Sequence, residues 1–214
     1  MLSLSLAPVY NHNLGTVQRI MNAAMPVGYS ETLIKKIFDP PISKVFSRIG
    51  EGEADLFVSY HKDIPVGVLC ACPQNAAGPL YRQDKPNKKK LVQCEVYVAG
   101  VAVLPRFQGR GIGTRLMEWL EGMVAKVNAL DASTTGTQHD AKGPRIAESD
   151  DAAASVGVMG CPLRITNIIL HVWAKNDEAI RFYMEMNYVD TKVIKDYYER
   201  IEEPHAVCME KRLE

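Results

Sequence analysis

The sequence of 214 residues lacks the features that mark several large classes of protein. No run of apolar residues approaches the roughly 18 that a membrane-spanning helix needs. The N-terminus has neither the basic segment nor the long apolar core of a signal peptide. Neither sign of charge is in excess, because 25 lysines and arginines balance 25 aspartates and glutamates. We therefore expect a protein that binds neither a membrane nor nucleic acid directly.

Cysteine is scarce, and it is spread along the chain. The five cysteines are odd in number and show no regular spacing: Cys70, Cys72, Cys94, Cys161 and Cys208. Such thiols are typical of a reducing compartment, and no second Cys/His pair has the spacing of a zinc site. The sequence therefore predicts an intracellular protein without a metal, in the cytoplasm and also in the nucleus. A metal or redox role for Cys70 and Cys72 is the alternative.

The chain does have the composition of an ordinary soluble protein. Apolar residues make up 47% and charged residues 23% of the sequence, and the length suffices for one domain with a full core. We expect a single domain over residues 1–214. Residues 129–160 are rich in Ala, Ser, Thr, Gly and Asp without an apolar period, which predicts a flexible surface insertion. A partner-binding or regulatory segment is the alternative for this stretch.

The stretch from residue 101 to residue 117, with the residues that flank it, organises the chain. It begins with β-branched and aromatic residues that favour a strand, and it ends with apolar residues at the 3.6-residue period of a helix. Between them lies Gln108-Gly-Arg-Gly-Ile-Gly113, whose glycines let backbone N–H groups approach an anion closely. The glycine spacing of a Rossmann fingerprint and the Gly-Lys-Ser/Thr of a P-loop are both absent. The pattern is Gln-x-x-Gly-x-Gly, which predicts a phosphate-binding loop; a glycine-rich turn without a ligand is the alternative.

Apolar periods and turn residues predict a mixture of strands and helices. The expected strands are 2–6, 55–60, 65–72, 91–104, 164–173, 188–193 and one that includes 207–209, with a loop at 73–90. The expected helices are 13–24, 31–38, one after residue 113, and one that opens at Asn176 and Asp177 and turns Ala179, Ile180, Tyr183 and Met184 inward. Asn187 is expected to end that last helix in a left-handed conformation.

This order of elements and two motifs resemble the GNAT superfamily of N-acetyltransferases. The first motif is the glycine turn, and the second is Asn176-x-x-Ala179-x-x-Phe182-Tyr183. The resemblance implies an α/β (α+β) fold, in which helices flank a central mixed, mostly antiparallel sheet. It also implies acetyl-CoA as the co-substrate. The residues that it places around acetyl-CoA are Val101, Val103, Gln108, Gly109, Arg110, Gly111, Ile112, Gly113, Thr114, Asn176 and Tyr183.

Further stretches look like the catalytic subunits of the NatE N-terminal acetyltransferases. They are Met25-Pro-Val-Gly-Tyr29, Tyr97, Asn167-Ile-Ile-Leu-His-Val172 and Lys195-Asp-Tyr-Tyr-Glu-Arg-Ile201. The chain departs from that pattern at four positions. Met25 stands where Phe is usual, and Gly28 stands where a small polar residue is usual. Gln108 takes the place of Arg, and Asn187 takes the place of Gly. The resemblance implies acetyl transfer to protein or nascent-peptide N-termini, with Met followed by an apolar residue preferred. It also implies a NatA-type ribosome-associated complex as partner.

The resemblance assigns roles to individual side chains. It implies that Tyr97 and His171 hold a water that removes a proton from the attacking amine, as suits an imidazole with an ordinary pKa of about 6.5. It implies that a backbone N–H near Val103 stabilises the oxyanion, and that Tyr183 orients or protonates the departing thiolate. It implies that the peptide contacts Met25, Pro26, Val27, Tyr29, Tyr197, Tyr198 and Ile201.

Taken one by one, these side chains have ordinary structural alternatives. His171 could equally be a buried histidine in an Ile/Leu/Val strand with no catalytic role. Tyr97 could be an ordinary aromatic residue of a strand, and Tyr183 could be a helix residue packed into the core. Tyr197 and Tyr198 suit an exposed strand end. For the whole chain, the alternatives are an acetyltransferase of internal lysines or small amines, and a CoA-binding scaffold subunit of an acetyltransferase complex.

Overall fold

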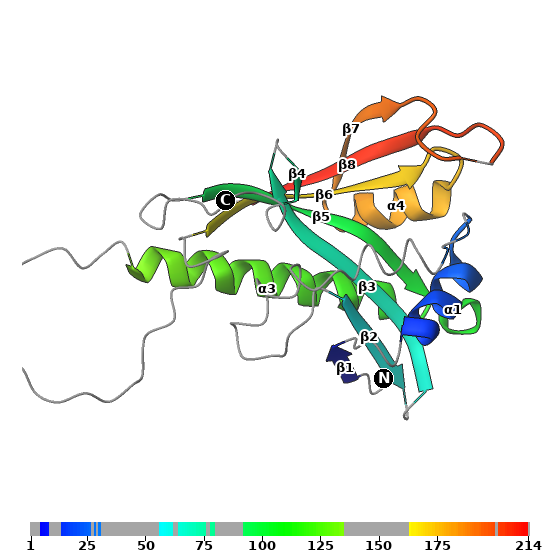
Figure 1. The fold of residues 1–214 in the computed structure, drawn as a ribbon, viewed down its shortest axis with the longest axis horizontal. Helices are drawn as coiled ribbons and strands as arrows, with labels where there is room; N and C mark the ends of the chain where they lie inside the picture. Colours follow the sequence, from blue (N-terminus) through cyan, green and yellow to red (C-terminus); the bar gives the residue numbers. More distant parts are fainter. Residues whose placement is uncertain are drawn as a thin grey trace, which may run out of the picture.

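The structure, a computed structural model, forms one sheet with helices on both of its faces (Figure 1). It describes residues 5–8, 14–26, 28, 30, 56–61, 64–75, 78–79, 92–134, 163–199 and 201–213. The helix predicted at 31–38, most of the predicted insertion, Val27 and Tyr29 therefore lie outside the described residues.

The strands follow the order β1-β2-β3-β5-β6-β8-β7 across the sheet, and β4 pairs with β3. The pair β5–β6 is parallel, and the other pairs of described strands are antiparallel. The expected mixed, mostly antiparallel sheet is therefore confirmed. The bounds are β1 Ser5–Pro8, β2 Leu56–His61, β3 Ile64–Asn75, β4 Gly78–Pro79, β5 Val92–Val103, β6 Leu163–Trp173, β7 Val189–Ile194 and β8 Ala206–Arg212.

The helices cover the two faces of the sheet. The first helix, α1 (Leu14–Ala24), packs against Val68 and its neighbours, whereas α3 (Ile112–Thr134) and α4 (Asp177–Glu185) pack on the side of Leu69. These two strand residues are adjacent, and adjacent strand residues point to opposite faces. None of the helices in the described ranges is long and apolar enough to cross a membrane.

The strands β5 and β6 separate part of the way along, and this opens the sheet. The pairing of β6 with β5 ends at Val98 and Leu170, whereas β3 follows β5 as far as Val103. At the point of separation the register between β3 and β5 shifts, so that Ala99 is an extra residue in β5. An extra residue of this kind bends a strand and disrupts its pairing. Residues 100–103 are therefore paired with β3 on one edge and separated from β6 on the other.

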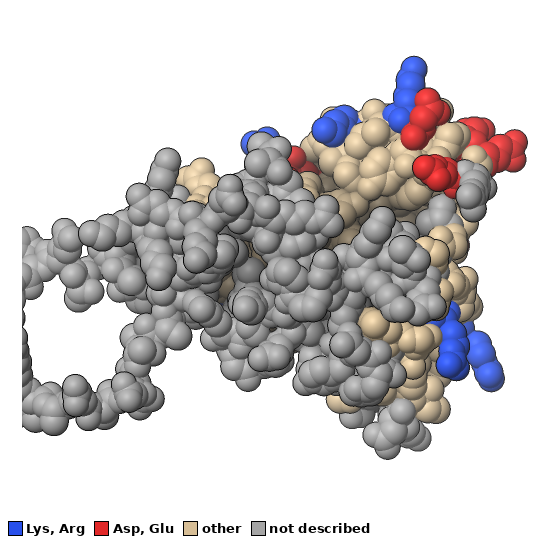
Figure 2. All heavy atoms as spheres, viewed as in Figure 1, with Lys and Arg blue, Asp and Glu red and all other residues tan. Residues whose placement is uncertain are grey.

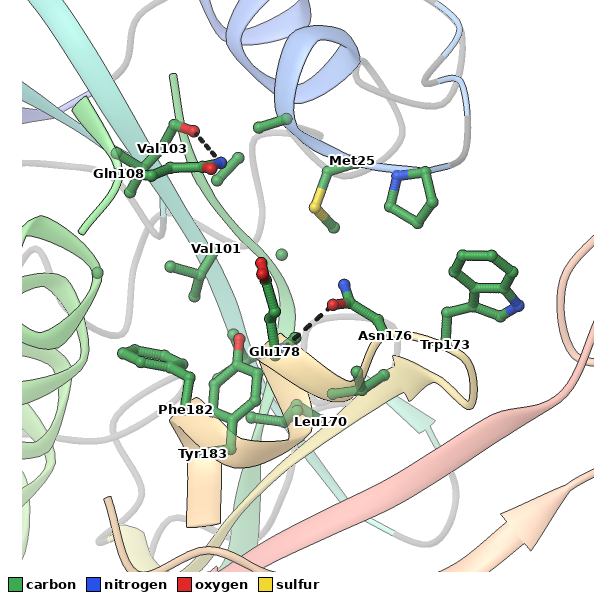
Figure 3. Close-up of a pocket in the computed structure, with 18 of the residues that line it drawn as sticks. Met25, Val101, Val103, Gln108, Leu170, Trp173, Asn176, Glu178, Phe182 and Tyr183 are labelled. Atoms are coloured by element: carbon green, nitrogen blue, oxygen red, sulfur yellow. Dashed lines mark hydrogen bonds between the residues drawn. The ribbon is translucent and has the colours of Figure 1, made fainter. Parts of the chain in front are cut away.

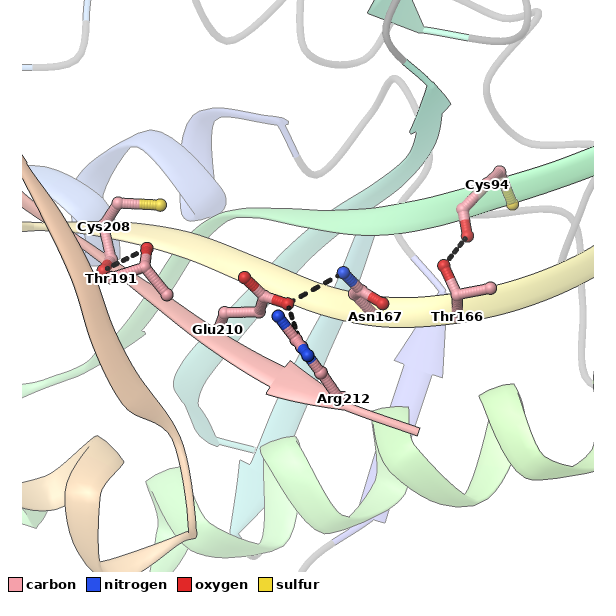
Figure 4. A network of polar contacts seen from close by, with 7 residues as sticks. All are labelled: Cys94, Thr166, Asn167, Thr191, Cys208, Glu210 and Arg212. Atoms are coloured by element: carbon pink, nitrogen blue, oxygen red, sulfur yellow. Dashed lines mark hydrogen bonds and ion pairs between the residues drawn. The ribbon is translucent and has the colours of Figure 1, made fainter. Parts of the chain in front are cut away.

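Polar side chains bind the strands together at the opposite end of β6. Thr166 Oγ1 donates to the Cys94 carbonyl at 3.1 Å, beside the point where the registers of β5 and β6 shift. Asn167 and Arg212 both donate to the Glu210 carboxylate, at 2.9 and 3.1 Å (Figure 4). These bonds link β5, β6 and β8, so the sheet is fixed where its strands pair and separates only beyond Val98.

The larger differences from the predicted boundaries are in β1, β3 and α3. The first strand is described over Ser5–Pro8, so it extends past the predicted end at residue 6, and residues 2–4 lie outside the described residues. Strand β3 continues past the predicted start of a loop at residue 73, because residues 73–74 still pair with β5 and residues 74–75 pair with β4. Helix α3 runs through Thr134, so the prediction of a flexible insertion that starts at residue 129 was wrong for residues 129–134. The Asn128 side chain exchanges two hydrogen bonds of 2.8 Å with the backbone of Ile165, which holds this part of the helix against β6.

The last helix follows the prediction except on one side chain. The Asn176 side chain accepts a hydrogen bond from the Ala179 amide at 3.1 Å and so caps α4. Asn187 has a φ of 64°, which confirms the left-handed end of the helix. Met184 was predicted to face inward, and this was wrong, since it is 47% exposed. Tyr183 takes the buried position of this turn, and its neighbour therefore points outward.

Candidate active site

A pocket of about 780 Å³ lies where β5 and β6 separate. This volume is within the range of roughly 300–1,000 Å³ typical of small-molecule sites. Its walls are the end of α1, the second half of β5, the turn into α3, the end of β6, the start of α4 and the β7–β8 loop (Figure 3). The predicted site residues that line it are Met25, Pro26, Tyr97, Val101, Val103, Gln108, Gly109, Gly111, Ile112, Gly113, Thr114, His171, Asn176, Tyr183, Tyr197 and Tyr198.

The turn between β5 and α3 presents main-chain atoms to the pocket. Gly109 and Gly111 have φ angles of 67° and 75°, a left-handed conformation that costs other residues roughly 1–2 kcal/mol. A Cβ on Gly113 would lie 3.3 Å from the Phe182 ring, so glycine there also lets α3 and α4 approach each other. The first backbone N–H groups of α3, which begins at Ile112, have no partner within the helix. The turn therefore suits an anion such as a phosphate.

The predicted oxyanion donor lies on the free edge of β5. The Leu104 amide donates to the Val66 carbonyl of β3 at 2.9 Å. Because backbone groups of successive strand residues point to opposite edges, the N–H and C=O of Val103 point toward the space left by β6. The Gln108 side chain donates to that Val103 carbonyl at 3.0 Å (Figure 3). The Val103 N–H thus faces the pocket beside the glycine turn.

The start of α4 forms the wall across from β5. Tyr183 is 7% exposed, and its ring packs edge-on against Phe182 and Tyr188 at centroid distances of 4.9 and 5.7 Å. Asn176 uses its side-chain oxygen to cap the helix at the rim of the pocket. Between these residues the Glu178 carboxylate points into the pocket (Figure 3). This wall therefore combines a buried aromatic floor with polar groups at its rim.

Two of the three predicted catalytic side chains, Tyr97 and His171, contact each other at the other end of the pocket, whereas Tyr183 lies in the α4 wall. His171 Nδ1 lies 3.3 Å from the Tyr97 hydroxyl, from two neighbouring strands. The Tyr97 and Tyr197 hydroxyls are 2.9 Å apart, and the Tyr197 ring lies 4.6 Å from the imidazole. The Tyr198 hydroxyl donates to the His171 carbonyl at 3.3 Å. One imidazole and three tyrosines, from three segments of the chain, thus form a single cluster.

The surroundings of His171 favour its neutral form. Burial lowers its pKa below the usual 6.5, and the positive charge of Lys192 lowers the pKa further. At neutral pH the imidazole is therefore uncharged and has a nitrogen lone pair that can accept a proton. A side chain in this state can act as a general base.

Two of the predicted residues that the structure describes lie outside the pocket, and several of its lining residues were not predicted. Arg110 is exposed, and its guanidinium lies 5.8 Å from the Phe107 ring. Ile201 is half-buried in the β7–β8 loop and is not part of the lining. The unpredicted lining residues with aromatic or charged side chains are Phe107, Trp173, Lys175, Glu178 and Phe182. All five lie within two positions of a predicted site residue in the sequence, so this proximity was the available signal.

Comparison of this chain with known protein families identifies the family to which it belongs. The profile of the Acetyltransferase (GNAT) family matches residues 17–143, which is more than half of the chain. The chain belongs to the GNAT family of acetyltransferases.

Relatives of this GNAT chain resemble it over nearly its whole length. N-alpha-acetyltransferase 50 of Danio rerio is 22% identical over 210 residues, which cover 98% of this chain and 89% of the relative. The structure of Arabidopsis thaliana Naa50 in complex with the bisubstrate analogue CoA-Ac-MVNAL has a TM-score of 0.60 and 21% identity, and covers 99% of this chain and 100% of that one. The structure of the NatC complex bound to Gag peptide and CoA has a TM-score of 0.57 and 15% identity, and the match covers 100% of both chains. The likeness to these structures confirms the GNAT fold.

The co-substrate of this GNAT enzyme is acetyl-CoA, whose thioester supplies the acetyl group. The pocket fits it, because glycines with positive φ and the start of α3 offer backbone N–H groups to its pyrophosphate. Among the described residues, no group of three or more His, Cys, Asp and Glu side chains gathers as metal ligands do. The chain is thus an acetyl-CoA-dependent N-acetyltransferase.

Proposed function

We propose that this enzyme acetylates the α-amino group of protein N-termini, with a preference for Met followed by an apolar residue. The observation that carries the proposal is the contact of His171 and Tyr97 with Tyr197, at the end of the pocket away from the glycine turn. The resemblance to N-alpha-acetyltransferase 50, and to a structure whose bisubstrate analogue joins CoA to a peptide that begins Met-Val, supports it.

In the proposed reaction the amine attacks the thioester carbonyl directly. A free α-amine has a pKa of about 7.7–8.0, so a weak base suffices to deprotonate it near neutral pH. Tyr97 and His171 hold the water that takes this proton, and the neutral imidazole accepts it. The Val103 N–H donates to the developing oxyanion. Tyr183 orients the departing thiolate or gives it a proton.

The proposed peptide site lies between the end of α1 and the β7–β8 loop. Met25 and Pro26 give it an apolar wall, and Tyr197 and Tyr198 add hydroxyl groups for the peptide backbone. Val27, Tyr29 and Ile201 extend this wall in the proposal. Apolar walls of this kind suit a Met side chain followed by a large apolar residue, because both then leave water.

Three peptides test the proposed function. The first begins Met-Leu, the second is the same peptide with a blocked N-terminus and an internal lysine, and the third begins Met-Asp. We expect transfer from acetyl-CoA to the free Met-Leu peptide, weaker transfer to Met-Asp, and none to the blocked peptide. Mass spectrometry of the products locates the acetyl group. Transfer mainly to the blocked peptide would contradict the proposal.

Acetylation of internal lysines is a second candidate, because the β7–β8 loop is acidic. Its exposed carboxylates are Asp196, Glu199, Glu202 and Glu203, and acidic side chains gather at this end of the molecule in Figure 2. Such a rim attracts a lysine side chain or basic residues of a peptide. The blocked peptide measures this activity directly. Transfer to neither peptide, with acetyl-CoA still bound, would instead favour a small-amine substrate or a scaffold role.

We also propose that the enzyme works in the cytoplasm and nucleus, on nascent chains within a NatA-type ribosome-associated complex. Support comes from the relatives, because one similar solved structure is the NatC complex. The test is sedimentation of the tagged chain with ribosomes before and after a high-salt wash. A chain that never sediments with ribosomes would contradict this part of the proposal.

A further inference from the structure

The β7–β8 loop, residues 195–205, is attached to the segment between β6 and α4 through one of its residues. The Trp173 indole Nε1 donates to the Glu203 carbonyl at 3.0 Å. The Lys175 ammonium lies 2.9 Å from the Glu203 carboxylate. Trp173 and Lys175 also line the pocket. Side chains of the pocket wall therefore hold both the backbone and the side chain of a single loop residue.

The loop is folded tightly around this attachment. Glu203 has a φ of 49°, a left-handed conformation that a residue with a Cβ keeps only where its surroundings enforce it. Its carbonyl also accepts from the His205 amide at 2.7 Å, and the His205 carbonyl accepts from the Ala174 amide at 2.9 Å. The Tyr198 amide donates to the Pro204 carbonyl at 2.9 Å. These backbone bonds connect Glu203 to the tyrosines of the loop, so the position of the tyrosines depends on the position of Glu203.

The tyrosines in turn complete the catalytic cluster. Tyr197 approaches Tyr97 at 2.9 Å, and Tyr198 donates to the His171 carbonyl at 3.3 Å. Tyr197 is 38% exposed, so little of the core holds it in place. Its position therefore depends on where the loop is held.

We propose that Trp173 and Lys175, acting through Glu203, are positioning residues for the acceptor half of the site. They hold the β7–β8 loop so that its tyrosines reach the catalytic histidine and tyrosine. This inference rests on the proposed function, since it assigns the tyrosines to the bound peptide.

The two contacts differ in strength. The Lys175 and Glu203 side chains are each 54% exposed, and ion pairs that water and salt reach contribute little. The Trp173 bond goes to a backbone carbonyl in the folded turn, and the indole also fills part of the pocket wall. We therefore assign most of the positioning to Trp173 and a smaller, salt-sensitive part to Lys175.

The main test compares the two tryptophans of the chain. Trp173→Phe keeps an aromatic ring and removes the N–H donor, so the KM for the Met-Leu peptide is expected to rise about fivefold, as for the loss of one hydrogen bond. The KM for acetyl-CoA is expected to change less than twofold. Trp119→Phe makes the same replacement on α3, away from the loop, and is expected to leave both constants unchanged. An equal effect of the two variants on the peptide KM would overturn the proposal.

The second test compares two lysines. Lys175→Gln removes the ion pair and is expected to raise the peptide KM about twofold at low salt, with no effect at high salt. Lys195→Gln changes the same charge within the loop and is the matched control. If Lys175 instead served the anionic co-substrate, its loss would raise the KM for acetyl-CoA, and that result would overturn the role given to it here.

A spectroscopic measurement separates a failure of this inference from a failure of the proposed function. In the Trp119→Phe background Trp173 is the sole tryptophan, so its emission reports the attachment of the loop without any substrate. Adding Lys175→Gln is expected to shift this emission to the red, because a looser loop exposes the indole. Wild-type enzyme that acetylates no peptide would refute the proposed function, whereas active enzyme with no emission shift and unchanged peptide KM values would refute the inference.

Discussion

The two ends of the pocket are built from different parts of the polypeptide. The end that we propose for acetyl-CoA, the cofactor end, uses the main chain, in the glycine turn 108–114 and the free edge of β5, and adds the Asn176 cap. The end that we propose for the peptide, the acceptor end, uses the side chains of Tyr97, His171 and the β7–β8 loop. The cofactor end should therefore be sensitive to any added Cβ, whereas the acceptor end should depend on particular functional groups. Four predictions separate the two ends, from the largest expected effect to the smallest.

Removing the imidazole tests the acceptor end. His171→Ala is expected to lower kcat about 100- to 1,000-fold, because a positioned base contributes roughly that much. The KM for acetyl-CoA is expected to stay within twofold, since the glycine turn is untouched. Steady-state kinetics with the Met-Leu peptide measure both constants. A loss of cofactor affinity as large as the loss of kcat would show that the two ends are not separate.

Adding a Cβ tests the cofactor end. Gly111 has a φ of 75° and open space around it, so Gly111→Ala strains the backbone by roughly 1–2 kcal/mol without a clash. The KM for acetyl-CoA is expected to rise about tenfold, with the peptide KM unchanged. Gly122→Ala is the control, because that glycine lies inside α3 with open space and no positive φ. It is expected to raise the melting temperature and leave the kinetics alone.

The Asn176 cap connects the fold to the cofactor end. Asn176→Ala is expected to lower the free energy of unfolding by about 1 kcal/mol, because the Ala179 amide loses its acceptor. Asn176→Asp keeps a capping oxygen and adds a negative charge beside an anionic co-substrate. It is expected to preserve stability in urea unfolding while raising the KM for acetyl-CoA several-fold. Equal stability of the two variants would argue against the cap.

The pH dependence gives the smallest effect. The pKa of His171 is lowered by burial and by Lys192, and a base acts only when deprotonated, so activity should fall as pH drops through that lowered value. Lys192→Gln removes the cation, raises the pKa and moves the fall to higher pH, less so at high salt. The measurement is kcat/KM as a function of pH for Lys192→Gln and for the control Lys195→Gln. The amine of the peptide titrates equally with both variants, so it does not contribute to the difference. A shift to lower pH would contradict this account.

Most of the architecture could be predicted because it depends on short stretches. Strand β5, the glycine turn and helix α4 with its Asn176 cap and left-handed Asn187 all follow from residues within a few positions of each other. Predictions failed where distant contacts decide. Asn128 in the second half of α3 bonds to Ile165 of β6, 37 residues away, and the exposure of Met184 depends on which neighbour the core accepts.

The sequence by itself determined the glycine turn that we expect to bind phosphate, the mixed order of strands and helices, and the residue types of the proposed base and its neighbours. Only the tertiary structure decided that Tyr97 meets His171 and Tyr197, which are 74 and 100 residues away. It also decided where β5 and β6 separate, and that the Trp173 indole donates a hydrogen bond to the Glu203 carbonyl of the β7–β8 loop. The physical reason is that strand registers and loop attachments are set by packing across the whole sheet, whereas turns and caps are set by neighbouring residues along the chain.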